Sequence, residues 1–126
     1  ARDWGYAPEY MEAAWRMLQQ KKPDDFVIAT GKSHTVRELV EEAFLQVGVT
    51  LKWKGRGIRE VGVDVQKGTV RVKIDPNYFR PNEVDYLRGD ARKAKRILGW
   101  KSTTSFKKLI ALMVEAKCAR VGYTRP

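Results

Sequence analysis

Apolar residues recur at helical spacing in several parts of the chain, and the first such stripe comes near its start. The stripe consists of Met11, Ala14, Trp15 and Leu18. Pro8 precedes it, at a position that proline favours in the first turn of a helix. This spacing predicts a helix over about residues 8–20, with the stripe facing the core.

A second helical pattern carries its own start and stop signals. Thr35 and Glu38 have the spacing of a capping box, in which the hydroxyl and the carboxylate satisfy amide groups at a helix start. Gly48 is expected to end the helix, because glycine readily takes the left-handed conformation beyond a last turn. The side chains expected to face the core are Leu39, Val40, Ala43, Phe44 and Val47.

Two further helices are predicted towards the end of the chain. Asp90 is expected to be the N-cap of a helix through Leu98, with Gly99 as its C-terminal stop. Thr104 or Ser105 is expected to open the last helix, and residues 122–126 to form a frayed tail. The apolar face of the last helix contains Phe106, Leu109, Ile110, Met113 and Val114.

Between the helices, the hydrophobic pattern changes to one typical of strands. Residues 26–29 form a continuous apolar run, which favours a strand buried on both faces, as in a parallel sheet. Residues 51–54 alternate apolar and polar side chains. Alternating runs at 61–65 and 70–74 predict a β-hairpin. The pattern therefore predicts one small mixed α/β domain over residues 1–126, with a β-hairpin and about four helices.

Composition describes a soluble globular chain. Of its 126 residues, 43% are hydrophobic and 32% charged, and no apolar run approaches the roughly 20 residues of a membrane span. The net charge of +10 attracts polyanions and phosphorylated ligands. Because the basic residues are dispersed, a solvated surface is favoured, with a nucleic-acid-binding module as the alternative. The single cysteine, Cys118, and the lack of a signal peptide are typical of a cytoplasmic protein.

The chain lacks the residues for several kinds of catalytic site. One histidine and one cysteine cannot build a usual zinc site, so no metal is expected. A serine or cysteine triad would need the same histidine, His34, which is better interpreted as a turn residue before the capping box. The four tryptophans are expected to be core or interface residues rather than platforms for nucleic-acid bases.

Arg80 and Glu83 are candidate ligand-binding residues. Pro81 restricts Arg80 to an extended conformation, so that its guanidinium projects from a stiff segment and suits a phosphate. Glu83 offers a carboxylate that can accept hydrogen bonds from two neighbouring hydroxyls, as on a nucleotide ribose. The alternative is a surface ion pair between Arg80 and Glu83 that contributes little to stability.

These residues are part of a longer pattern. Arg80-Pro81-x-Glu83-Val84-Asp85 is followed by Gly89-Asp90, Lys93-Ala94 and Leu98-Gly99-Trp100-Lys101. Earlier segments are Arg2-Asp3-Trp4-Gly5 with Glu9-Tyr10, Asp25-Phe26-Val27-Ile28-Ala29-Thr30-Gly31, and His34-Thr35-Val36-Arg37-Glu38. In this order and spacing, the chain up to about Lys117 resembles the GDP-mannose 4,6-dehydratases, which are extended short-chain dehydrogenase/reductases. Glu9 stands where aspartate is usual in that family, and Tyr6 where histidine is common.

The resemblance implies a substrate site and a role. It places Arg80 and Arg2 on the diphosphate of GDP-mannose and Glu83 on the ribose hydroxyls. A complete enzyme of this kind converts GDP-mannose to GDP-4-keto-6-deoxymannose with bound NADP. A related nucleotide-sugar dehydratase or epimerase, acting on another sugar, is the alternative.

Two motifs of a complete enzyme of this kind are missing from the sequence. No Gly-x-x-Gly-x-x-Gly turn is available for a dinucleotide pyrophosphate, and no tyrosine is followed four residues later by lysine. We therefore expect the C-terminal substrate-binding domain of a longer protein, whose N-terminal Rossmann half holds NADP. Alone it is expected to have no catalytic residue, cofactor or activity, and to self-associate through the face that the Rossmann half would cover.

Overall fold

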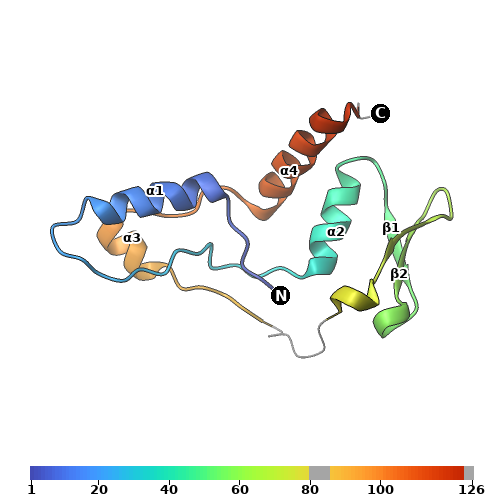
Figure 1. Cartoon of the computed structure of the whole chain (residues 1–126), viewed down its shortest axis with the longest axis horizontal. Helices are drawn as coiled ribbons and strands as arrows, with labels where there is room; N and C mark the ends of the chain where they lie inside the picture. The colour runs from blue at the N-terminus through green and yellow to red at the C-terminus, as the bar shows by residue number, and fades with distance from the viewer. Residues whose placement is uncertain (80–85, 124–126) are drawn as a thin grey trace.

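The computed structural model describes residues 1–79 and 86–123. Its helices are α1 (Ala7–Leu18), α2 (Val36–Leu45), α3 (Arg92–Leu98) and α4 (Phe106–Val121). Its strands are β1 (Leu51–Lys54), β2 (Val61–Asp64) and β3 (Val70–Lys73), with short 3-10 turns at Gly57–Arg59 and Pro76–Tyr78. Figure 1 shows α1 and α3 together at one end of the molecule and the sheet at the other. The predicted mixed α/β class is confirmed.

The capping box and the hairpin form as predicted. The Thr35 hydroxyl accepts a hydrogen bond from the Glu38 amide at 3.1 Å, and the Glu38 carboxylate accepts one from the Thr35 amide. Strands β1, β2 and β3 pair in that order, both pairs antiparallel. The Asp64 carboxylate accepts hydrogen bonds from the amides of Gln66 and Lys67, which stabilise the turn between β2 and β3.

Trp53 is one of the residues that link the sheet to α2. The Trp53 indole nitrogen on β1 donates a hydrogen bond to the Glu41 carboxylate on α2 at 2.6 Å. The Arg37 guanidinium lies over the same ring, 4.6 Å from its centroid, and its other contact is an ion pair with Glu60. These contacts link α2 to the sheet through one aromatic side chain and a cation–π interaction.

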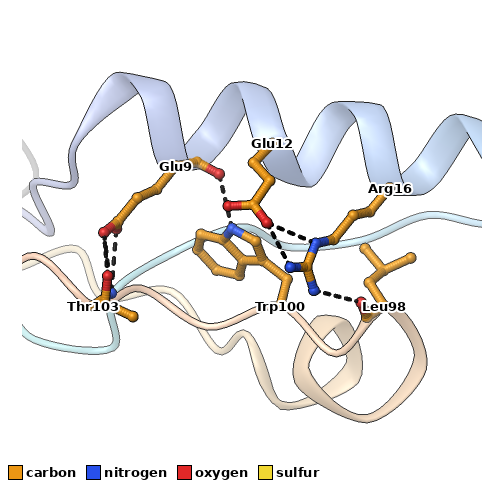
Figure 2. Close-up of polar contacts among 6 residues, drawn as sticks. All are labelled: Glu9, Glu12, Arg16, Leu98, Trp100 and Thr103. Atoms are coloured by element: carbon orange, nitrogen blue, oxygen red, sulfur yellow. Dashed lines mark hydrogen bonds and ion pairs between the residues drawn. The ribbon is translucent and has the colours of Figure 1, made fainter.

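The most deeply buried core lies between α1 and α3. Its centre is formed by Ala13, Ala94, Leu98 and Trp100, with partly buried Tyr10, Met17, Phe26, Ile28 and Ala91 around it. Gly99 takes a left-handed conformation, with φ of 62°, and ends α3 as predicted. This turn directs Trp100 back into the core, where its indole nitrogen donates to the Glu9 carbonyl at 2.8 Å (Figure 2).

The prediction of which side of α1 faces the core is wrong. Met11, Trp15 and Leu18 are 66%, 61% and 82% exposed, whereas Ala13 is fully buried. Hydrophobic periodicity identifies residues that share a face, but it does not say which part of an apolar surface a neighbouring element covers. Helix α3 covers the side of α1 that contains Ala13, and the predicted stripe lies beside it.

Residues 26–29 do not form the predicted strand. Phe26 and Ile28 pack against the core, but Val27 between them is 54% exposed. Within residues 1–79 and 86–123, none of these four residues makes a backbone hydrogen bond. A strand requires a neighbouring strand. The sheet that the structure describes contains only β1, β2 and β3.

Asp90 is not the N-cap of α3, which begins two residues later. Ala91 occupies the N-cap position and provides no side-chain cap. The Asp90 carboxylate instead pairs with the Arg92 guanidinium and accepts the Arg92 amide at 3.0 Å. These hydrogen bonds from the side chain and backbone of Arg92 lower the pKa of Asp90 to about 2.

The next helix, α4, starts at the predicted place. The Ser105 hydroxyl accepts a hydrogen bond from the Lys108 amide and so caps the first turn.

Glu9 connects α1 to the segment that precedes α4. Its carboxylate accepts hydrogen bonds from the hydroxyls of Ser102, Thr103 and Thr104 at 2.7–2.9 Å. It also accepts hydrogen bonds from the backbone amides of Thr103 and Thr104. Burial alone would raise the pKa of Glu9, but the hydrogen bonds from these three residues outweigh it and lower the pKa to about 2. Figure 2 shows Glu9 directed at Thr103, beside the Trp100 contact.

Glu9→Gln is expected to lower the free energy of unfolding at pH 7 by about 2–3 kcal/mol, because several charge-assisted hydrogen bonds are weakened. The folded-state pKa lies below the ordinary value of 4.5, so this contribution is present above pH 4.5 and is lost as the pH falls towards 2. Urea unfolding of both proteins at pH 7 and at pH 2.5 measures it.

Glu12→Gln is the matched control, because Glu12 on the same helix contacts only the Arg16 guanidinium at the surface. Its effect is expected to stay below about 1 kcal/mol. An effect of Glu9→Gln that is equally large at both pH values would contradict the assigned role of the Glu9 carboxylate.

Candidate functional site

Arg2 is the one predicted site residue that falls within the described part of the chain. Its amide and carbonyl pair with the carbonyl and amide of His34 at 2.8 and 2.9 Å. Its guanidinium also donates to the Ala1 carbonyl at 2.9 Å. His34, interpreted from the sequence as a turn residue, is therefore in an isolated β-bridge. Directly paired residues project to the same side, so the Arg2 side chain leaves the bridge on the side of the His34 ring.

Arg80 and Glu83 lie outside the described residues, but the chain that follows them returns next to Arg2. The Leu87 amide donates to the Ala1 carbonyl at 3.1 Å. The Ser33 hydroxyl donates to the Leu87 carbonyl at 2.6 Å. Segments near residues 1, 33 and 87 thus meet at one place, although the sequence separates them widely.

Asp3, which was not among the predicted site residues, organises this meeting point. Its carboxylate accepts hydrogen bonds from the amide and hydroxyl of Thr30. It also accepts hydrogen bonds from the amide of Gly31 at 2.8 Å and from the amide of Gly89 at 3.3 Å. A side chain on Gly89 would place its Cβ 2.2 Å from the Cβ of Ala29, so this close approach requires glycine. The partners lie 27 to 86 residues from Asp3, and no local pattern could have identified them.

A hollow of about 730 Å³ lies between α2 and the start of α4. One wall is a stack of three rings, in which Phe106 lies between Trp4 at 5.9 Å and His34 at 3.9 Å, measured between ring centroids. Its lining also includes the carboxylates Glu38, Glu41 and Glu42. Lys32 and Lys107 also line it, but the three carboxylates outnumber these two cations, so this hollow is a poorer place for a diphosphate than a cationic one.

A second hollow, of about 530 Å³, has the opposite charge. Residues 29–31 and 88–92 form part of it, and Asp3 fixes both segments by accepting hydrogen bonds from the amides of Gly31 and Gly89. Its cationic side chains are Arg88, Arg92, Lys95 and Lys101. Its one carboxylate, Asp90, is paired with Arg92. The sequence indicated that the basic residues are dispersed, whereas the fold gathers these four cations around one concavity that favours an anionic ligand.

Within the described ranges, no helix is long and apolar enough to span a membrane. The same residues contain no group of three or more side chains that could hold a metal ion.

The comparisons with known proteins all point to one family. The family model for GDP-mannose 4,6 dehydratase matches residues 1–113. The chain is 53% identical over 115 residues to the GDP-mannose 4,6 dehydratase of Drosophila melanogaster, covering 91% of this chain and 29% of that protein. It is 51% identical over 115 residues to that of Homo sapiens, covering 91% and 31%.

A bacterial relative gives the longest of these matches. The GDP-mannose 4,6-dehydratase of Sinorhizobium fredii is 48% identical over 124 residues, which cover 98% of this chain and 35% of that protein. The chain therefore spans about a third of the length of the curated relatives it matches. Since the family model covers nearly all of it, the chain belongs to the GDP-mannose 4,6 dehydratase family.

Proposed function

We propose that this chain is the substrate-binding part of a cytoplasmic enzyme that converts GDP-mannose to GDP-4-keto-6-deoxymannose and water, with bound NADP. The observation that carries the proposal is the identity of 48–53% to proteins of that name, together with a family match over residues 1–113, which contain Arg2, Arg80 and Glu83. In this proposal, Arg2 and Arg80 bind the diphosphate, and Glu83 binds the ribose hydroxyls.

The cationic hollow supports a phosphorylated ligand, although Arg2 is not among the residues that line it. The amides that Asp3 orders belong to the same segments that form the cationic hollow. A diphosphate held by arginines is fixed at one end, and this restricts the positions that the attached sugar can take. Such orientation is a contribution to catalysis that requires no reacting group from this chain.

The residues present do not fit NADP itself. A dinucleotide site needs a glycine-rich turn between a strand and an α-helix, so that the backbone can approach the pyrophosphate. The closest glycine pair, Gly55 and Gly57, instead leads from β1 into the 3-10 turn at Gly57–Arg59. We assign NADP, and the exchange of hydride with the sugar, to the part of the family's chain outside the match.

Loss of either diphosphate arginine is expected to weaken GDP-mannose binding by roughly ten- to a hundred-fold, since a charge-assisted contact contributes about 1.5–3 kcal/mol. The protein for this test is the human relative with its matched 115 residues replaced by those of this chain. Calorimetric titration of Arg2→Ala and Arg80→Ala measures the change. Arg59→Ala, in the 3-10 turn at Gly57–Arg59, is the control and should bind normally.

Glu83→Ala distinguishes a contact between Glu83 and the ribose from a surface ion pair between Glu83 and Arg80. It removes a hydroxyl acceptor and a negative charge together, so GDP-mannose should bind more weakly, while inorganic pyrophosphate binds equally well or better. Unchanged GDP-mannose affinity in both Arg80→Ala and Glu83→Ala, with NADP still bound, would reduce the two residues to the ion pair of the alternative interpretation.

A further inference from the structure

The cationic hollow of about 530 Å³ contains more positive charge than its own carboxylate can neutralise. Asp90 pairs with Arg92, and the charge of Arg88 contributes, after the hydrogen bonds from Arg92, to the low pKa of Asp90. Among the described residues, no ion pair or side-chain hydrogen bond is made by Arg88, Lys95 or Lys101. Four cations and one carboxylate leave the described lining with an excess of three positive charges.

The walls of this hollow are held in place by contacts within the chain itself. The Asp3 carboxylate accepts hydrogen bonds from the amides of Gly31 and Gly89, which lie on two different lining segments. A third segment is anchored by Trp100, which is 1% exposed and immediately precedes Lys101. A concavity whose backbone is already fixed loses little free energy to ordering when a ligand binds.

The position of the charges favours a ligand with several anionic oxygens. Arg88 lies in the loop before α3, Lys95 lies on α3, and Lys101 follows that helix. Phosphate oxygens accept charge-assisted hydrogen bonds from both arginine and lysine, and a diphosphate offers them on two centres. The one aromatic side chain of the described lining, Trp100, is almost wholly buried and leaves no ring face for a nucleotide base.

We infer that the cationic hollow is a second phosphate site, separate from the diphosphate arginines of the proposed function, and that it binds the diphosphate group of a nucleotide or of free pyrophosphate. Arg2 does not line it. Its volume is in the range of small-ligand sites, which is about 300–1,000 Å³. The inference rests on the geometry and charge of the hollow, not on the identity of the sugar substrate.

Titration of sodium pyrophosphate into the 126-residue chain, followed by nuclear magnetic resonance at the amides of Thr30, Gly89 and Lys101, tests the site. The shifts should saturate. Lys95→Gln and Lys101→Gln should each weaken binding by about three- to ten-fold, because each removes one exposed charge from the contact.

Arg96→Gln is the matched control for these variants. Arg96 is an exposed cation on the same helix as Lys95 but does not line the hollow, so its loss should change the affinity by less than about two-fold. Equal weakening by Arg96→Gln and Lys95→Gln would overturn the inference, because it would show only general attraction of anions to a chain of net charge +10.

Two further titrations examine the ligand and the separateness of the site. GDP and ADP should bind about as tightly as pyrophosphate, because the phosphates carry the recognition, and a clear preference for pyrophosphate would restrict the site to the free ion. Arg2→Ala should leave binding in the hollow unchanged. Shifts that do not saturate, GDP bound ten-fold more tightly than ADP, or binding abolished by Arg2→Ala would each contradict the inference. Loss of GDP-mannose binding with pyrophosphate still bound in the hollow contradicts only the proposed function.

Discussion

Trp100→Ala is expected to lower the free energy of unfolding by about 3–5 kcal/mol, which is a large share of the stability of a domain this size. Trp100 is 1% exposed and lies among Ala13, Ala94 and Leu98. Its ring meets Tyr10 edge-on at 5.9 Å. The substitution leaves a cavity and removes the hydrogen bond to Glu9.

Two variants separate these effects. Trp100→Phe keeps a ring in the core but leaves the Glu9 carbonyl without its donor, and should cost less than the alanine variant. Trp15→Ala, at a tryptophan that is 61% exposed, should change stability by less than about 0.5 kcal/mol. Urea unfolding followed by circular dichroism measures all three. Equal losses at Trp100 and Trp15 would contradict the placement of the core.

Asp3→Ala is expected to destabilise the chain by about 2–4 kcal/mol, because it removes the acceptor from several donors at once. The amides of Gly31 and Gly89 lose the carboxylate that holds their segments together. Both segments form part of the cationic hollow, so the variant should also loosen the candidate anion site.

Hydrogen exchange at Gly31 and Gly89 measures this loosening, and urea unfolding measures the loss of stability. Asp3→Asn keeps one acceptor oxygen without the charge and should be intermediate. Exchange at both glycines that is no faster in Asp3→Ala than in the original chain would show that the carboxylate does not hold the two segments together.

Features encoded over a few residues were predictable from the sequence. The capping box at Thr35 and Glu38, the stop at Gly99 and the hairpin depend on neighbours along the chain. Asp90 was a local feature that was predicted incorrectly as the N-cap: its carboxylate accepts both the amide and the guanidinium of Arg92, and α3 begins only at Arg92. Local rules therefore located this helix but not its first residue.

Features that depend on distant partners were not predictable. The contacts of Asp3 and Glu9 span up to 86 and 95 residues, and each acidic residue is unremarkable in its local sequence. The stripe on α1 and the run at 26–29 failed for a related reason. Each pattern correctly indicates a surface that prefers burial, but burial needs a covering element, and the described residues cover only part of each surface.

The most direct measurement of the central claim is titration of GDP-mannose into the human enzyme that carries this chain in place of its matched 115 residues, followed by product analysis. The proposed function predicts that GDP-mannose binds and is converted to GDP-4-keto-6-deoxymannose, and that Arg80→Ala weakens binding by roughly ten- to a hundred-fold. A folded hybrid that holds NADP but neither binds nor converts GDP-mannose would contradict it.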